Sequence, residues 1–271
     1  FKVEEVVNLS TLRFELFEGA VSPPCIVTLR PTEPDGEPLV YVSPKQVKAA
    51  GGAEVAETQY AIVIEPHDIS RVWPEEAANE PLVWTALAWG GRRDLAFVQR
   101  MCLVDNLQRR MGSEQVVSRE GIIRGSVEHP EIVGWHILEA EDFPDSSSLR
   151  LPIESLPVNR SPYTHRRTDL EAFGLPQLII KQGWTKSTGR FRAVVCEGVE
   201  GRGALCSQSY VSVHASNELA EWLESAALSY SSCLASYHLL LTSGRLASYR
   251  PEPLVEEIRT VPIAPPRAGL L

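Results

Sequence analysis

Residues 177–216 repeat one local pattern that restricts the fold more than any other feature of the chain. Three short runs rich in β-branched residues are separated by turns that contain glycine, which is typical of neighbouring β-strands. From 217 to 242, apolar residues then recur at steps of three and four, which predicts one long helix with its stripe in the core. We therefore expect an α/β (α+β) fold in which a mixed β-sheet is braced by this long helix.

The first turn of this stretch concentrates positive charge and aromatic rings. Basic side chains beside planar ones are suited to holding a phosphate backbone and probing bases, which predicts a DNA-binding surface. An ordinary antiparallel meander with a solvated basic turn explains the same residues, because charged turns usually lie at the surface. The candidate DNA contacts are Lys181, Trp184, Lys186, Arg190 and Arg192 in this turn, and Tyr163, Arg166 and Arg167 in a second cluster upstream.

Net charge restricts the kinds of partner that the chain can bind. The 271 residues carry a formal charge of -9, which argues against a uniformly basic nucleic-acid coat. A basic patch on one face stays possible, because phosphate contacts depend on local charge. The same acidic composition also suits a protein-interaction module that binds no nucleic acid, and we keep this as the alternative function.

Cysteine usage and hydropathy indicate the compartment. The five cysteines form no Cys-x-x-Cys pair and no zinc-type cluster with histidine, so a reduced, cytoplasmic protein without a metal is the simplest expectation. No run of 18 apolar residues and no signal peptide occurs, so we expect no membrane association. The chain opens at Phe1 within a strand-like run, and we expect it to be a fragment of something longer.

Two parts are expected in chain order. Residues 1–112 combine short apolar runs with helical stretches, whereas residues 113–271 are richer in β-type runs and contain the basic turn. The compact apolar run at 25–29 predicts a buried strand. An amphipathic helix is expected from Asp94 until Gly112 ends it.

Three stretches together share their order with a known family. They are residues 7–27, residues 87–94 with the helix that follows, and residues 120–263, which include Glu120-Gly-Ile-Ile-Arg-Gly125 and Arg190-Phe-Arg-Ala193. In this order they resemble the C-terminal half of the N6-adenine DNA methylases of restriction–modification and phage-defence systems. The first two stretches are similar to the end of the methylase catalytic domain, and the third is similar to its target recognition domain.

The resemblance implies the end of a methylase-type sheet in residues 1–112 and a target recognition domain in residues 113–271. The partners would be double-stranded DNA and the remainder of the methylase, and S-adenosylmethionine would be the cofactor of the full-length methyltransferase. Residues 22–25 (Ser-Pro-Pro-Cys) have the prolines of the catalytic tetrapeptide but lack its polar first residue and its aromatic residue. The glycines at 198–203 predict a hairpin turn instead of a donor-binding loop. We therefore expect this chain alone to be inactive, with no catalytic, cofactor or metal residues.

Two histidines offer a third possibility, an enzyme of another class. His67 and Asp68 follow a strand and form either an acid–base pair or a turn cap. His136 alternates with apolar neighbours, which is typical of a core histidine with satisfied hydrogen bonds.

Overall fold

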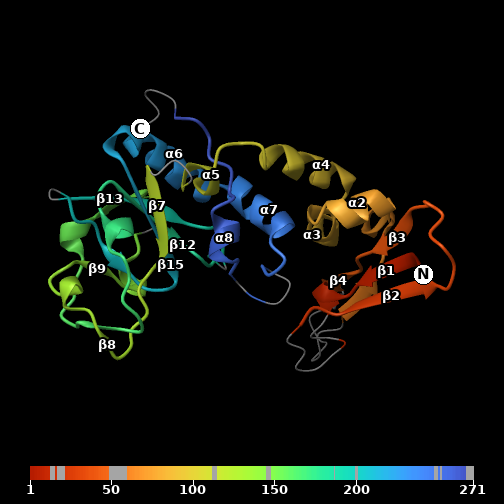
Figure 1. Cartoon of the computed structure of the whole chain (residues 1–271), viewed down its shortest axis with the longest axis horizontal. Helices are drawn as coiled ribbons and strands as arrows, with labels where there is room; N and C mark the ends of the chain where they lie inside the picture. The colour runs from red at the N-terminus through yellow and green to blue at the C-terminus, as the bar shows by residue number, and fades with distance from the viewer. Residues whose placement is uncertain are drawn as a thin grey trace, which may run out of the picture. The chain divides into compact units, whose positions relative to one another are not determined.

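The computed structural model describes residues 1–12, 16, 22–48, 60–111, 115–144, 148–185, 187–198, 201–246, 250 and 252–266. Helices are interspersed with several mixed sheets, which confirms the α+β class at the coarse level (Figure 1). Packing divides the chain into two compact units. Unit 1 comprises residues 1–101 and 240–251, and unit 2 comprises residues 102–239 and 252–271.

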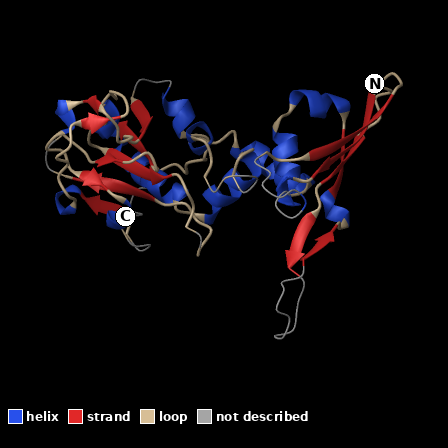
Figure 2. Cartoon of the chain, turned by 90° about the horizontal axis from the view of Figure 1, so that it is seen from below, coloured by secondary structure: helices blue, strands red, loops and turns tan. Residues whose placement is uncertain are grey.

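Unit 1 contains a four-stranded sheet in the order β2-β1-β3-β6, in which only β1 and β3 are parallel. The four strands are β1 (Lys2–Asn8), β2 (Cys25–Arg30), β3 (Leu39–Val42) and β6 (Ile69–Val72). A separate antiparallel pair consists of β4 (Lys45–Lys48) and β5 (Tyr60–Val63), with strands drawn red in Figure 2. The described helices are η1 (Ser10–Leu12), η2 (Pro66–Asp68), α2 (Pro74–Asn79), α3 (Leu82–Trp89) and α4 (Arg92–Met101).

Helix α3 covers the half of this sheet that contains β3. The Tyr41 ring meets the Trp84 ring edge-on with centroids 5.6 Å apart, and the Tyr41 hydroxyl donates to the Trp84 carbonyl at 3.0 Å. Burial raises the pKa of Tyr41 to about 12, so this hydroxyl stays a hydrogen-bond donor at neutral pH. Two residues further on, the Ser43 hydroxyl donates to the Ala88 carbonyl at 2.8 Å. These bonds fix α3 against one face of β3.

Strand β2 corrects a prediction about burial. The apolar run at 25–29 does form a strand, but all six residues of β2 are exposed, so the expectation of a buried strand is wrong. The reason is position, because β2 is the edge strand of the sheet and α3 lies over β3. An apolar run predicts burial only where another element covers the strand.

The helix predicted between Asp94 and Gly112 is two separate helices. Helix α4 buries Leu95, Val98 and Met101, which confirms the amphipathic character expected for the first part of this segment. The chain then leaves the helix and re-enters it as α5 (Leu107–Met111), because the Asn106 side chain accepts a hydrogen bond from the Arg109 amide at 3.0 Å and caps the new helix.

Helix α5 belongs to unit 2, so the division differs from the expected one near residue 112. Arg110 Nε donates to the Asp105 carboxylate at 2.8 Å, and the Trp222 indole donates to the same oxygen at 3.2 Å. The Gln108 amide also donates to the Arg259 carbonyl at 3.0 Å. The observed division falls between Met101 and Cys102, and Gly112 itself lies outside the described residues.

Unit 2 contains a five-stranded sheet in the order β10-β13-β12-β15-β7. These strands are β7 (Val116–Glu120), β10 (Arg150–Pro152), β12 (Gln177–Lys181), β13 (Ala193–Glu197) and β15 (Tyr210–Ala215). Two smaller pairs are β8 (Val127–Glu128) with β11 (Tyr163–Thr164), and β9 (Ile137–Leu138) with β14 (Leu205–Cys206). The short 3-10 helices are η3 (Pro130–Ile132), η4 (Ala140–Asp142), η5 (Ile153–Ser155) and η6 (Glu171–Phe173).

The three β-rich runs form strands as predicted, but their order in the sheet is not that of a meander. Strand β12 lies between β13 and β15 in the sheet. The last of the three runs, β15, therefore pairs with the first run, β12, and not with the second run, β13. The hairpin predicted at residues 198–203 is also wrong, because β14 pairs in parallel with β9 and not with β13. Residues 199 and 200 lie outside the described residues.

The long helix predicted over 217–242 is wrong as a single element. The segment consists of η7 (Asn217–Leu219), α6 (Ala220–Tyr230) and α7 (Cys233–Thr242), with a break at Ser231 and Ser232. The Ser231 hydroxyl accepts a hydrogen bond from the Ala193 amide of β13 at 3.2 Å, and the Ser232 hydroxyl donates to the Ser229 carbonyl at 2.6 Å. Serine side chains that bond to backbone in this way compete with the helix. Helix α6 packs on strands β12 and β13 of the sheet. The last helix of unit 2 that the structure describes is α8 (Val255–Ile258).

A buried histidine makes the stability of unit 2 dependent on pH. Burial lowers the pKa of His238 to about 4, whereas an unfolded histidine titrates near 6.5. As the pH falls below 6.5, the unfolded state binds a proton that the folded state excludes. We expect the free energy of unfolding to fall by about 2 kcal/mol between pH 6.5 and 5 from this group alone. Urea titrations of the original protein and of His238→Gln at both pH values measure the loss of stability that comes from His238. Equal losses in both proteins would contradict it.

Candidate nucleic-acid interface

The turn between β12 and β13 is held by backbone hydrogen bonds. The Lys181 amide donates to the Arg192 carbonyl at 2.8 Å, and the Thr185 amide donates to the Arg190 carbonyl at 2.7 Å. The turn closes at Gly189, whose φ of +63° is a conformation that glycine adopts without strain. In its described residues, the predicted basic turn is therefore the loop of a β-hairpin between β12 and β13.

This loop forms one side of a groove of about 780 Å³. Three of the candidate cations line it together: Lys181, Arg190 and Arg192. The other lining residues are Ala140, Phe143, Pro144, Thr185, Ser187, Thr188 and Ser231. Lys186 lies outside the described residues. The structure thus gathers three of the eight candidate side chains in one recess, and adds hydroxyl groups from the same loop.

Two of these cations are available to a ligand. Arg190 is exposed and Lys181 is partly exposed. Within the described part of the chain, neither side chain has a hydrogen-bond or ion-pair partner. A lysine and an arginine beside threonine and serine hydroxyls form a set of hydrogen-bond donors suited to phosphate oxygens.

Arg192 shapes the groove wall. Its guanidinium donates to the Ser148 carbonyl at 3.1 Å and, more weakly, to the Pro144 carbonyl at 3.5 Å. The same group lies 5.7 Å from the centre of the Phe143 ring, which stacks on Tyr210 at 5.6 Å with an interplanar angle of 8°. Part of its hydrogen-bonding capacity is therefore used inside the protein.

The segment that supplies Ala140 and Phe143 to the groove also contains three acidic residues, although none of them lines the groove. Burial is the main cause that raises the pKa of Tyr210 to about 12, and the nearby Asp142, Glu139 and Glu141 raise it further. Of these carboxylates, Glu139 is paired with Arg124. Among the residues that line the groove, the cations come from the hairpin and its strands: Lys181, Arg190 and Arg192.

Trp184 stabilises the loop instead of lining the groove. It is half-buried, and its ring lies 6.3 Å from the ring of Phe191, which is fully buried. Through this contact the loop that carries Arg190 is packed against the core of unit 2.

The second cluster occupies a different surface of unit 2. Tyr163 belongs to β11, and its side chain is 51% exposed. Arg166 and Arg167 are also exposed, and Arg167 Nε donates weakly to the Glu128 carbonyl of β8 at 3.4 Å. None of the three lines the groove. The eight candidates therefore do not form one continuous site.

The histidine candidates have structural partners. His67 is exposed, with Nδ1 3.3 Å from Glu65, and the neighbouring Asp68 is buried and accepts the Glu65 amide at 3.0 Å, as a turn cap does. His136 Nδ1 lies 2.8 Å from the Leu156 carbonyl oxygen. Among the described residues, no cluster of histidine, cysteine and carboxylate side chains has metal-binding geometry.

Sequence reasoning missed the groove residues other than the cations. Thr185, Ser187 and Thr188 belong to the same loop, and their density between Gly183 and Gly189 is a signal that was present in the sequence. Phe143 comes from a distant segment, and no local pattern connects it to the loop.

No protein-family model matches this chain, and no curated protein matches it. None of the described helices has the length and apolar character needed to cross a membrane.

Proposed function

We propose that the chain recognises double-stranded DNA, and that it acts as the target recognition part of an N6-adenine DNA methylase. The observation that supports DNA binding is the pairing of Lys181 and Arg190, two cations without internal partners among the described residues, on one wall of the groove. The methylase assignment is supported by the sequence resemblance. Methyl transfer and S-adenosylmethionine binding belong, in this proposal, to the remainder of the methylase.

Binding to DNA would depend on short-range contacts. The chain carries a formal charge of -9, which repels a polyanion at a distance. Only cations that lie directly against the phosphates then contribute, because salt screens exposed charges beyond roughly 10 Å. We therefore expect weak binding by the isolated chain and tighter binding by the complete methylase.

The salt dependence of DNA affinity tests the proposal. Each phosphate contact contributes about 0.9 to the slope of log affinity against log salt concentration. If Lys181 and Arg190 each contact a phosphate, the variant Lys181→Ala/Arg190→Ala should flatten the slope by about 1.8. Fluorescence anisotropy with a labelled duplex at several salt concentrations measures this slope.

A matched control changes two cations of unit 1. Arg92 and Arg93 lie at the start of α4 and are exposed, so Arg92→Ala/Arg93→Ala removes the same charge from another surface. We expect this variant to keep the original slope. If both double variants give equal slopes, the groove is not the DNA contact and the protein-interaction alternative becomes the better proposal.

A further inference from the structure

One face of the unit 1 sheet is left partly uncovered. In the register of the strands, Val6 pairs with Tyr41 on one side and with Val27 on the other, so the three side chains lie on the same face. Leu29 follows Val27 by two residues and points to that face as well. Helix α3 covers Tyr41, but Val27 and Leu29 stay 48% and 53% exposed.

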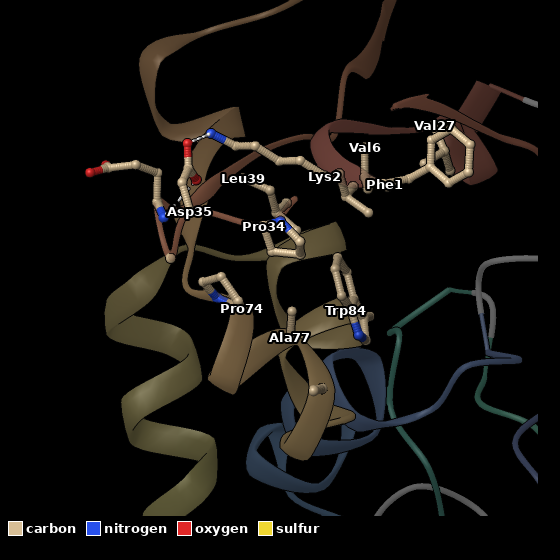
Figure 3. Close-up of a pocket in the computed structure, with 14 residues that line it drawn as sticks. Phe1, Lys2, Val6, Val27, Pro34, Asp35, Leu39, Pro74, Ala77 and Trp84 are labelled. Atoms are coloured by element: carbon tan, nitrogen blue, oxygen red, sulfur yellow. Dashed lines mark hydrogen bonds and ion pairs between the residues drawn. The ribbon is translucent and has the colours of Figure 1, made fainter. Parts of the chain in front are cut away.

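A groove of about 410 Å³ runs beside this uncovered face (Figure 3). The sheet supplies Val6, Val27 and Leu39, and the helices supply Ala77 and Trp84. In Figure 3, Ala77 and Trp84 lie on the helix side of this space, Val6 and Leu39 lie on the strand side, and Val27 lies beside the Phe1 ring. Because Ala77 is small, it leaves room for another backbone to approach the helix side of the groove.

The charges around the groove indicate what it can accept. Lys2 is paired with Asp35 at 2.6 Å, so these two charges neutralise each other. Glu37 also lines the groove, and within the described residues its carboxylate has no ion-pair partner. An occupant should therefore be apolar along most of its length, with one positive charge beside Glu37.

We propose that this apolar groove binds an amphipathic α-helix of another polypeptide segment, with a cationic residue near Glu37. The proposal rests on the proposed function, which makes the remainder of the methylase the source of this helix. A helix fits better than a small molecule, because the apolar surface continues past the groove along β2 to Leu29. It would lie on the same face as α3 and complete the helical layer over β1 and β2.

An apolar dye tests whether the groove is open in the 271-residue chain. We expect 8-anilinonaphthalene-1-sulfonate to fluoresce on binding, and Val27→Asp to reduce this signal at least threefold. Thr28→Asp is the matched control, since Thr28 is the next residue of the exposed strand and points to the opposite face. Equal signals from the two variants would overturn the assignment of the apolar site to this face.

Crosslinking in the complete methylase tests the occupant. A photoreactive benzoylphenylalanine at position 27 should form a crosslink to a helical segment outside residues 1–271, identified by mass spectrometry of the crosslinked peptides. The same group at position 26 should not give that peptide, because Ile26 lies on the other face and is 55% exposed. A crosslink to a second copy, crosslinks confined to residues 1–271, or none at all would overturn the proposal. This readout needs no DNA, so its failure is distinct from a failure of DNA binding.

Discussion

Replacing Gly121 by alanine is expected to destabilise unit 2 by about 3 kcal/mol. A Cβ atom at this position would lie 2.0 Å from the Ser207 carbonyl oxygen and 2.5 Å from the Cys206 carbonyl oxygen. Both neighbours are backbone atoms, and the Ile122 amide holds the crossing strand in place through a hydrogen bond to Cys206 at 2.7 Å. The clash therefore cannot be relieved by a side-chain rotation. Urea unfolding followed by circular dichroism measures the loss.

Gly183→Ala is the matched control for this substitution. Among the described residues, and apart from Gly183 and its two chain neighbours, no heavy atom lies within 4 Å of the position that a Cβ would occupy. The same change of one methyl group should then leave the free energy of unfolding within about 1 kcal/mol of its original value. Similar losses of stability in the two variants would show that the close approach of the Ser207 and Cys206 backbone to Gly121 is not the cause of the destabilisation.

Replacing Gln177 by leucine is expected to cost about 4 kcal/mol of stability, the largest effect that we predict. The side chain is fully buried in the central strand β12. Its Nε2 donates to the Ala204 carbonyl at 2.7 Å and to the Ser212 hydroxyl at 2.8 Å, while its Oε1 accepts the Ala204 amide at 2.7 Å. Leucine would leave the amide and carbonyl of Ala204 buried without these partners, and each such group costs about 1–3 kcal/mol.

Gln182→Leu makes the same chemical change at the residue that follows strand β12. Within the described part of the chain, the Gln182 side chain makes a single, long hydrogen bond, to Glu120 at 3.4 Å. We expect its loss to change the free energy of unfolding by less than about 1 kcal/mol. Thermal or urea unfolding of both variants decides the matter, and a Gln177 variant as stable as the Gln182 variant would contradict the role of the buried network.

The local structure of the chain was predicted well where short patterns determine it. The β-rich runs at 177–181 and 193–197 are strands, and the spacing of Leu95, Val98 and Met101 marks the buried side of α4. Part of the candidate site was also predictable, because Lys181 and Arg190 lie at the two ends of one turn and a hairpin brings them together.

Other features depend on segments that are distant in sequence. The break after α6 needs the contact between Ser231 and Ala193, which lie 38 residues apart. The role of Arg192 depends on hydrogen bonds from its guanidinium to the carbonyls of Pro144 and Ser148. Because of these bonds, a side chain predicted to contact DNA forms part of the groove wall. Neither the spacing of apolar residues nor a turn motif indicates contacts between residues this far apart, so sequence patterns could not predict them.

By itself, the sequence determined the coarse class of the fold, the position of the strands formed by the three β-rich runs and the concentration of charge in one turn. These properties follow from alternation, glycine conformations and side-chain chemistry, which act over a few residues. Only the tertiary structure decided that β12 lies between β13 and β15, and that the apolar run of β2 is exposed. Strand order and burial depend on which surfaces meet, and that is settled by the packing of the whole unit.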